Sequence, residues 1–300
     1  MPNYRPRERS QLTPVALMLA TDGIAQVAPI FAAEVIQQLN TIMDPIFEAQ
    51  SSKARSYVTI EDMAHHGLID TILGCEMRNL LLSIVPDPVL YHCHAYEIAA
   101  NSKQSHIFGD NASGWHRDED SEHFEKDATH ASIFVYLTDV GRQDGPFEFS
   151  PFEPTKWVRT TNPAITVTGA SGYSFAWNRS FYHRASPNTG PVRRRLLKLS
   201  IQPNSFRSCH LSNANFQAAR NIVPYGDPYL DLLLGRFQGK ASPSLRPPAP
   251  VMPMKIEPTG SINIPNTELT KLKLKEKARE VRTWLKRRII GETAQVPAYD

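Results

Sequence analysis

The spacing of apolar residues changes near residue 88, and this change divides the chain into a helical part and a strand-rich part. Between residues 29 and 43 the apolar positions recur three and four residues apart, which predicts an amphipathic helix that begins near Pro29. Two further helices are predicted over residues 59–64 and 68–84, and Pro86 and Pro88 end the second of them. The first part of the chain is therefore expected to be mainly helical.

Residues 89–203 show the pattern of short strands. Residues 89–98 are rich in strand-forming side chains, and turn signals such as Gly145-Pro146 and Asn188-Thr189-Gly190 interrupt the segment from there to residue 203. This rhythm suits a jelly roll or barrel of antiparallel strands better than alternating β-α units. Helices first and a sheet afterwards predict an α+β fold in which the N-terminal helices buttress one face of the sheet.

The two ends of the chain differ from this core in composition. Residues 1–20 are rich in proline and arginine and are predicted to be irregular, so the folded domain is expected to span residues 21–240, with a last short helix at 228–237. Residues 241–265 are rich in proline and are interpreted as an extended linker. Residues 266–300 are predicted to form a basic amphipathic helix and a tail, because apolar residues recur there at helical intervals.

Composition and charge limit the classes of function. No apolar run approaches the roughly 20 residues that a membrane span requires, and no secretory signal peptide is recognised. Three unpatterned cysteines argue against a disulfide scaffold and favour a cytoplasmic protein. The net charge of +3 is too small to indicate nucleic acid as a partner.

The basic character belongs to the C-terminal helix, since residues 266–290 hold nine Lys or Arg against three Glu. This helix is expected to pack on its own domain or to mediate self-association. Binding to an acidic partner or to an anionic membrane surface are the alternatives. The sequence does not predict the oligomeric state.

Three residues form a candidate metal site. His116 and Asp118 are separated by one residue, and His183 follows 65 residues after Asp118. Side chains at i and i+2 of an extended strand point to the same face, so His116 and Asp118 could both reach one metal. Two imidazoles and one carboxylate form the facial triad that binds non-haem Fe(II) and leaves coordination positions open. The alternative is that both histidines lie in surface loops.

Three consecutive arginines follow His183, and they suggest what the open positions hold. Arg193, Arg194 and Arg195 lead into a strand-like run at residues 196–201, so strand alternation lets only some of them face inward. Iron bound on one face can take a 2-oxoacid and then O2, and a guanidinium fork suits the distal carboxylate of 2-oxoglutarate. The alternative is a solvated edge strand whose charges discourage sheet aggregation.

Together, His116-x-Asp118, the segment from His183-Arg184-Ala185-Ser186 to Pro191 and the following arginines resemble the phytanoyl-CoA dioxygenase-like branch of the Fe(II)/2-oxoglutarate oxygenases. The resemblance implies a double-stranded β-helix (jelly roll, cupin-like) core, Fe(II) as the metal, and 2-oxoglutarate and O2 as co-substrates. It implies that Arg194, eleven residues after the distal His, holds 2-oxoglutarate. The resemblance runs from about residue 22 to about residue 203, and it implies an opening strand at residues 22–27.

Further residues are candidates for the cofactor or substrate site. Ser186 and Trp115 are the other predicted cofactor-binding residues. The aromatic residues that line an apolar substrate pocket or pack the interior are Trp115, Trp177, Phe147 and Phe149. His92 and His94 are expected to be core or wall residues. His123 and His130 lie in a charged loop that either faces water or forms a lid over the site.

The expected function is the hydroxylation of an aliphatic C–H bond in a small metabolite or natural-product intermediate. Asp118 argues against halogenation, since halogenating relatives place a small residue at that position. The same chemistry on a lipid-linked saccharide is one alternative. A non-catalytic jelly-roll binding module and a metal-dependent isomerase or hydrolase are the others, and extra His or Glu ligands would be expected for the latter.

Overall fold

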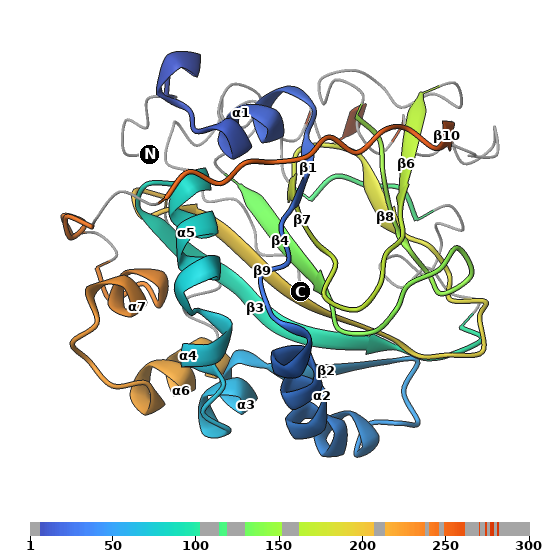
Figure 1. Ribbon diagram of the computed structural model, residues 1–300, viewed down its shortest axis with the longest axis horizontal. Helices are drawn as coiled ribbons and strands as arrows, with labels where there is room; N and C mark the ends of the chain where they lie inside the picture. Colours follow the sequence, from blue (N-terminus) through green and yellow to red (C-terminus); the bar gives the residue numbers. More distant parts are fainter. Residues whose placement is uncertain are drawn as a thin grey trace.

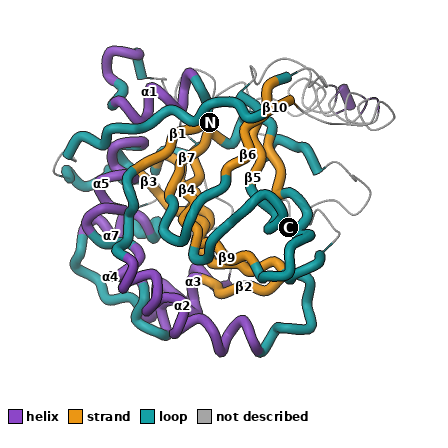
Figure 2. The backbone as a smooth tube through the Cα atoms, turned by 45° about the vertical axis from the view of Figure 1, so that its right-hand side comes forward, coloured by secondary structure: helices purple, strands orange, loops and turns teal. Residues whose placement is uncertain are grey.

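The computed structural model describes residues 7–102, 114–118, 130–151, 162–206, 214–237, 240–245 and 249–261, together with residues 270, 274, 277, 278 and 281. Within these residues, two antiparallel sheets lie against each other, and helices cover the outer side of the larger sheet (Figures 1 and 2). A mixed helix and sheet fold with helices buttressing one face was expected from the sequence, and this arrangement is confirmed.

The chain passes repeatedly between the two sheets. The larger sheet has the strand order β1-β7-β4-β9-β3-β2, and the smaller sheet has the order β10-β6-β5-β8. From β4 to β9 the strands therefore fall in the larger, smaller, smaller, larger, smaller and larger sheet, the kind of alternation a jelly roll requires. The bounds are β1 Ile24–Val27, β2 Arg55–Thr59, β3 Pro88–Ile98, β4 Ala131–Tyr136, β5 Phe147–Phe149, β6 Pro163–Val167, β7 Ser174–Asn178, β8 His183–Ala185, β9 Arg194–Pro203 and β10 Gly260–Ser261.

The helices follow the predicted pattern with shifted ends. The helix expected from Pro29 begins at Ala33, and the helix expected over residues 68–84 is two helices with Gly74 between them. Strand β2 and helix α6 were not predicted. The helices are α1 Pro14–Thr21, α2 Ala33–Glu48, α3 Ile60–His65, α4 Ile69–Ile72, α5 Cys75–Ile84, α6 Ala214–Ile222 and α7 Pro228–Leu233, with a short 3-10 turn at Arg9–Gln11.

Helix α1 corrects the prediction that residues 1–20 are irregular. The hydroxyl oxygen of Thr13 accepts a hydrogen bond from the backbone N–H of Ala16 at 3.3 Å, and Pro14 is the first helical residue. Proline fits this position because the first helical N–H has no partner within the helix. Val15 and Leu19 are fully buried. Residues 14–20 therefore belong to the folded domain.

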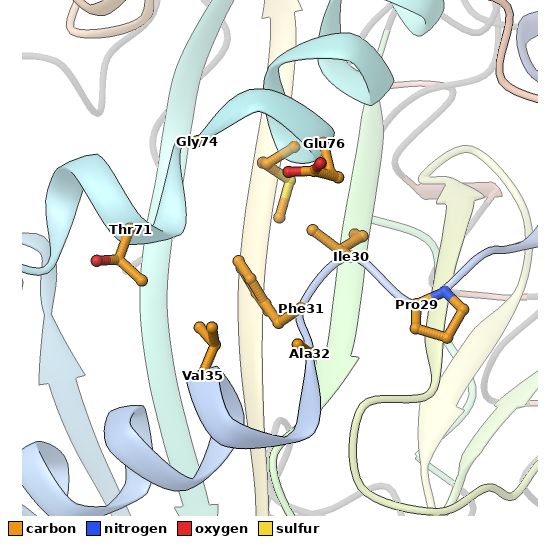
Figure 3. Close-up of a pocket in the computed structure, with 9 residues that line it drawn as sticks. Pro29, Ile30, Phe31, Ala32, Val35, Thr71, Gly74 and Glu76 are labelled. Atoms are coloured by element: carbon orange, nitrogen blue, oxygen red, sulfur yellow. The ribbon is translucent and has the colours of Figure 1, made fainter.

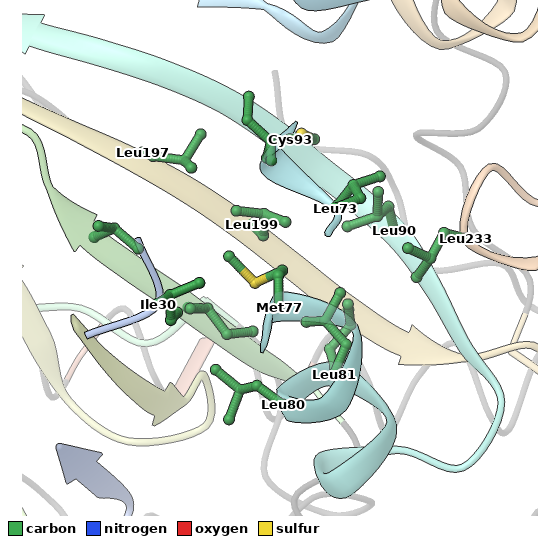
Figure 4. Close-up of a cluster of buried hydrophobic side chains, with 14 of the residues drawn as sticks. Ile30, Leu73, Met77, Leu80, Leu81, Leu90, Cys93, Leu197, Leu199 and Leu233 are labelled. Carbon is green, nitrogen blue, oxygen red and sulfur yellow. The ribbon is translucent and has the colours of Figure 1, made fainter. Parts of the chain in front are cut away.

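The structure has two hydrophobic cores. One fills the space between the helices and the outer face of the larger sheet, where Met77 and Leu81 of α5 belong to the same cluster as Leu199 of β9 and Cys93 of β3 (Figure 4). The other lies between the two sheets and is mainly aromatic. Its members are Ile24, Tyr96, Ile98, Phe134, Tyr136, Val140, Phe147, Phe149, Ile165, Val167, Phe175, Trp177, Phe181 and Leu196.

Residues 249–261, which we call the C-terminal strap, lie along both sheets (Figure 1). Met254 pairs with Gln26 of β1, and β10 pairs with β6. The hydroxyl oxygen of Thr259 accepts a hydrogen bond from the backbone N–H of Thr166 at 2.9 Å. The sequence suggested an extended linker here, but these contacts bind residues 249–261 to the domain, so the segment is not a free spacer.

The predicted basic helix at residues 266–290 lies mostly outside the described residues. The few described positions there, 270, 274, 277, 278 and 281, are helical and exposed. Among the helices that the structure describes, none has the length and apolar character needed to cross a membrane.

Candidate metal centre

The predicted metal ligands converge at one end of the space between the sheets. His116 and His183 form an antiparallel bridge, with N–H to C=O distances of 3.0 and 2.9 Å. Asp118 Oδ1 lies 3.4 Å from His116 Nε2 and 3.6 Å from His183 Nε2. The three ligand atoms lie within 4.8 Å of one another, which suits coordination of a single ion.

Backbone carbonyls fix the orientation of both imidazoles. His116 Nδ1 lies 2.8 Å from the carbonyl oxygen of Gly114, and His183 Nδ1 lies 3.0 Å from that of Phe181. A carbonyl oxygen only accepts hydrogen bonds, so each Nδ1 carries the proton and each Nε2 keeps its lone pair. Histidines that bind metals are usually held in this way.

Arg179 holds the carboxylate of Asp118. Its Nη2 and Nε donate to Asp118 Oδ2 at 2.7 and 3.0 Å, which leaves Oδ1 directed toward the two imidazoles. The Arg179 guanidinium also lies over the Tyr91 ring, 4.4 Å from its centre. Arginine thus fixes which carboxylate oxygen faces the cluster.

The protonation states suit a metal. Burial alone would raise the pKa of Asp118, but the imidazoles of His183 and His116, which attract the carboxylate when they are protonated, hold this pKa well below its usual value. Burial and the neighbouring His116 lower the pKa of His183 to about 4. At neutral pH the carboxylate is therefore charged and the His183 imidazole neutral, which are the forms that coordinate a metal ion.

The three arginines at the start of β9 point to opposite sides of the sheet, as strand alternation predicted. Arg193 and Arg195 face outward and both bind Glu97, which is 1% exposed. Arg194 is fully buried between the sheets. Its Nη1 donates to the carbonyl oxygen of Gly145 and its Nη2 donates to the Tyr96 hydroxyl at 3.1 Å.

The third nitrogen of the Arg194 guanidinium, Nε, is buried and has no hydrogen-bond partner among the described residues. No carboxylate in the described part of the chain pairs with this guanidinium. A buried cation without a counter-ion is costly. The donor set therefore fits an anionic ligand such as the distal carboxylate of 2-oxoglutarate.

The two other predicted cofactor-binding residues have different surroundings. Ser186 lies at the turn that holds Arg194, because its N–H donates to the carbonyl oxygen of Pro146 at 3.0 Å. The Ser186 hydroxyl is buried without a partner among the described residues, so its role stays a prediction. Trp115 packs against the Arg184 guanidinium, whose centre is 5.1 Å from the ring. Arg184 alternates with His183 along β8, so the Trp115 ring lies away from the metal ligands.

Aromatic and basic residues line the space beside the metal ligands. The rings of Trp177 and Phe147 lie 4.2 and 5.6 Å from the His183 ring. His94 of β3 is the register partner of Lys198 of β9, on the face that also carries His92. The two histidines are thus wall residues, as expected.

Phe149 and His130, two further candidates from the sequence, are both buried. Phe149 packs against Phe181 within the core between the sheets, with ring centres 5.5 Å apart. His130 is buried against Phe206, whose ring lies 5.2 Å away, so this histidine does not face water. His123 and the charged loop around it lie outside the described residues.

Sequence reasoning missed Arg179 and Arg55. Arg179 lies in the turn between β7 and β8, and no local pattern marks it as a partner of Asp118. Arg55 belongs to β2, which was not predicted. Both act through contacts between distant parts of the chain.

A separate hollow of about 480 Å³ lies between the start of α2 and the start of α5 (Figure 3). Ile30, Phe31, Val35 and Met77 line it, together with Glu76. It holds none of the candidate metal ligands, so it is distinct from the candidate metal centre.

Comparison with known proteins supports the fold. No family model matches the sequence, and no curated protein matches it. Among solved structures, AviO1 from Streptomyces viridochromogenes Tue57 has a TM-score of 0.51 at 18% identity, covering 66% of this chain and 96% of that one. EctD from S. alaskensis with bound Fe has a TM-score of 0.51 at 13% identity, covering 69% of this chain and 83% of that one. At such identities the likeness shows a shared fold.

Proposed function

We propose that the chain is a non-haem Fe(II)- and 2-oxoglutarate-dependent dioxygenase that hydroxylates an aliphatic C–H bond of a small metabolite or natural-product intermediate. The observation that carries the proposal is the convergence of His116, Asp118 and His183, with both Nε2 atoms and one carboxylate oxygen directed to a common point. The resemblance of the sequence to the phytanoyl-CoA dioxygenase-like family and the fold shared with EctD, whose structure holds iron, support the same assignment.

Arg194 supports the choice of co-substrate. A fully buried guanidinium whose Nε has no hydrogen-bond partner in the described part of the chain suits a carboxylate better than a neutral group. Ser186 lies at the adjoining turn, and none of the described residues bonds to its hydroxyl. In this proposal Arg194 binds the distal carboxylate, and Ser186 assists.

Each residue of the site has a defined task. His116, Asp118 and His183 hold the metal, and Arg179 keeps Asp118 Oδ1 directed toward it. When bound, Fe(II) with 2-oxoglutarate and O2 supplies the oxidising power that breaks an unactivated C–H bond, with release of succinate and CO2. Trp177 and Phe147 flank His183 and exclude water from that side of the site.

Ligand binding in the absence of oxygen provides the first test. Fe(II) and 2-oxoglutarate added anaerobically should produce a weak visible absorption band in the wild-type protein. Asp118→Asn should abolish the band and, in air, the formation of succinate, because the variant loses the charged ligand oxygen.

Asp231→Asn is the matched control. Asp231 also pairs with a buried arginine, Arg236, but lies in helix α7 outside the candidate site. This variant should keep the band. A folded wild-type protein that gives no band would contradict the proposed function and favour a binding module without iron chemistry.

A further inference from the structure

A second arginine faces the same interior space as Arg194. In the larger sheet, Arg55 of β2 is the register partner of Ile98 of β3, and Ile98 is the partner of Arg194 of β9. Directly opposed residues of an antiparallel sheet point to the same face. Ile98 belongs to the core between the sheets, so Arg55 and Arg194 both point inward.

The two guanidinium groups meet at the Tyr96 ring. The Arg55 Cζ lies 3.9 Å from the centre of this ring and 5.0 Å from that of Tyr57. The Arg194 Cζ lies 5.5 Å from the Tyr96 ring centre, and its Nη2 binds the hydroxyl of the same residue. Tyr96 is thus shared by both arginines.

Neither arginine has a carboxylate partner in the described part of the chain. The Nε atoms of Arg55 and Arg194 are both buried without a hydrogen-bond partner there. The neighbouring arginines differ, since Arg193 and Arg195 on the outer face share Glu97. The described residues thus supply a counter-ion to the outer arginines, Glu97, and none to the inner pair.

The surroundings of Arg55 and Arg194 leave both side chains charged, which favours an anionic ligand. Burial lowers the pKa of Arg55, the two tyrosines oppose that change, and the charge of Arg194 adds to it. Aromatic faces stabilise a cation by about 0.5–2 kcal/mol without neutralising it. Both positive charges therefore stay available to a ligand.

We propose that Arg55 and Arg194, organised on Tyr96, together bind the distal carboxylate of a dicarboxylic 2-oxo acid. The proposal rests on the function proposed above and adds Arg55 as a residue that determines co-substrate specificity. It follows that a 2-oxo acid without a distal carboxylate gains nothing from Arg55.

Binding to the nickel-loaded protein tests this assignment without turnover. Calorimetry would compare 2-oxoglutarate with 2-oxobutyrate, which offers the same chelating end but no distal carboxylate. Arg55→Gln should raise the Kd of 2-oxoglutarate about tenfold or more, as expected for a lost charge-assisted hydrogen bond. The Kd of 2-oxobutyrate should not change.

Two further variants control the experiment. Arg55→Met keeps an unbranched side chain against Tyr96 and Tyr57 but lacks the charge, so it should reproduce the effect of Arg55→Gln if that variant folds poorly. Lys53→Gln removes an exposed charge two residues away and should leave both Kd values unchanged.

The outcomes separate the two proposals. An unchanged Kd of 2-oxoglutarate in a folded Arg55 variant, or an equal loss for both ligands, would overturn the role of Arg55 while leaving the metal centre intact. A wild-type protein that binds no nickel would instead overturn the proposed function and this inference with it.

Discussion

Replacing Arg179 tests whether the ion pair with Asp118 serves the metal centre or only the fold. Arg179→Met removes two charge-assisted hydrogen bonds, at 2.7 and 3.0 Å, while keeping an unbranched side chain beside Tyr91. The side chains of Arg179 and Asp118 are only 5% and 17% exposed, so water replaces the lost donors poorly. Asp118 would lose the contact that directs Oδ1 toward the imidazoles.

Two separate effects are expected, one on stability and one on metal affinity. Loss of one partner from a buried ion pair costs about 3–5 kcal/mol of stability. Loss of a residue that orients a metal ligand weakens metal binding about 10–100-fold. We therefore expect Arg179→Met to lower both the free energy of unfolding and the affinity for Mn(II) or Co(II). Arg179→Lys should fall between this variant and the wild type, since an ammonium group keeps the charge but not the fork.

Arg236 provides a matched control for this experiment. It pairs with Asp231 at similar burial, 6% and 12% exposed, and its guanidinium lies 3.8 Å from the Tyr225 ring centre. Arg236→Met should lose at least as much stability in urea unfolding, because Arg236 also donates to the carbonyl oxygens of Arg220 and Val223, but it should keep the wild-type affinity for the metal. Calorimetry below the melting temperature of both variants would measure that affinity. Wild-type metal affinity in Arg179→Met would refute the positioning role.

Two further results are expected from the structure. Gly145 has φ +69°, and a Cβ there would lie 2.8 Å from the Ser186 carbonyl oxygen, whereas Gly67 has φ +67° with open space around it. Gly145→Ala should therefore lose clearly more stability in urea unfolding than Gly67→Ala. Equal losses would contradict the close contact. Burial raises the pKa of the Cys93 thiol to about 12, whereas Cys75 is exposed. At pH 8, iodoacetamide should therefore label Cys75 in the native protein, and Cys93 only after urea unfolds the chain. Peptide mass mapping that finds Cys93 labelled in the native protein would contradict its burial.

Local pattern was enough to predict the larger features of the fold. Residue spacing predicted β3 within one residue of its observed start, because that strand carries many strand-forming side chains. Strand β2 was missed since its inward positions are Arg55, Tyr57 and Thr59, which show no apolar alternation. Helix α1 was missed because Thr13-Pro14 was read as part of an irregular segment, although it forms the helix start.

Some residues of the candidate site could likewise be predicted from local sequence, and others could not. Spacing and residue type predicted that His116, Asp118 and His183 converge, as they do, and their role as metal ligands stays a prediction. The i, i+2 rule acts within one extended segment, and the distal histidine is a recognisable ligand type. Alternation along β9 predicted that the arginines would separate to two faces. Arg179 and Arg55 depend on pairing between strands and turns that are far apart in the chain, so no local signal marked them.

The C-terminal strap changes where the folded unit ends. Strands β1 and β6 are the outermost strands on one side of the two sheets, apart from the strap itself, and residues 249–261 pair with both. A chain truncated before residue 249 would leave N–H and C=O groups of β1 and β6 open to pairing with another molecule. An expression fragment designed to stop at the end of α7 would therefore lack the segment that covers these two strands, and a fragment that keeps it must extend at least to Ser261.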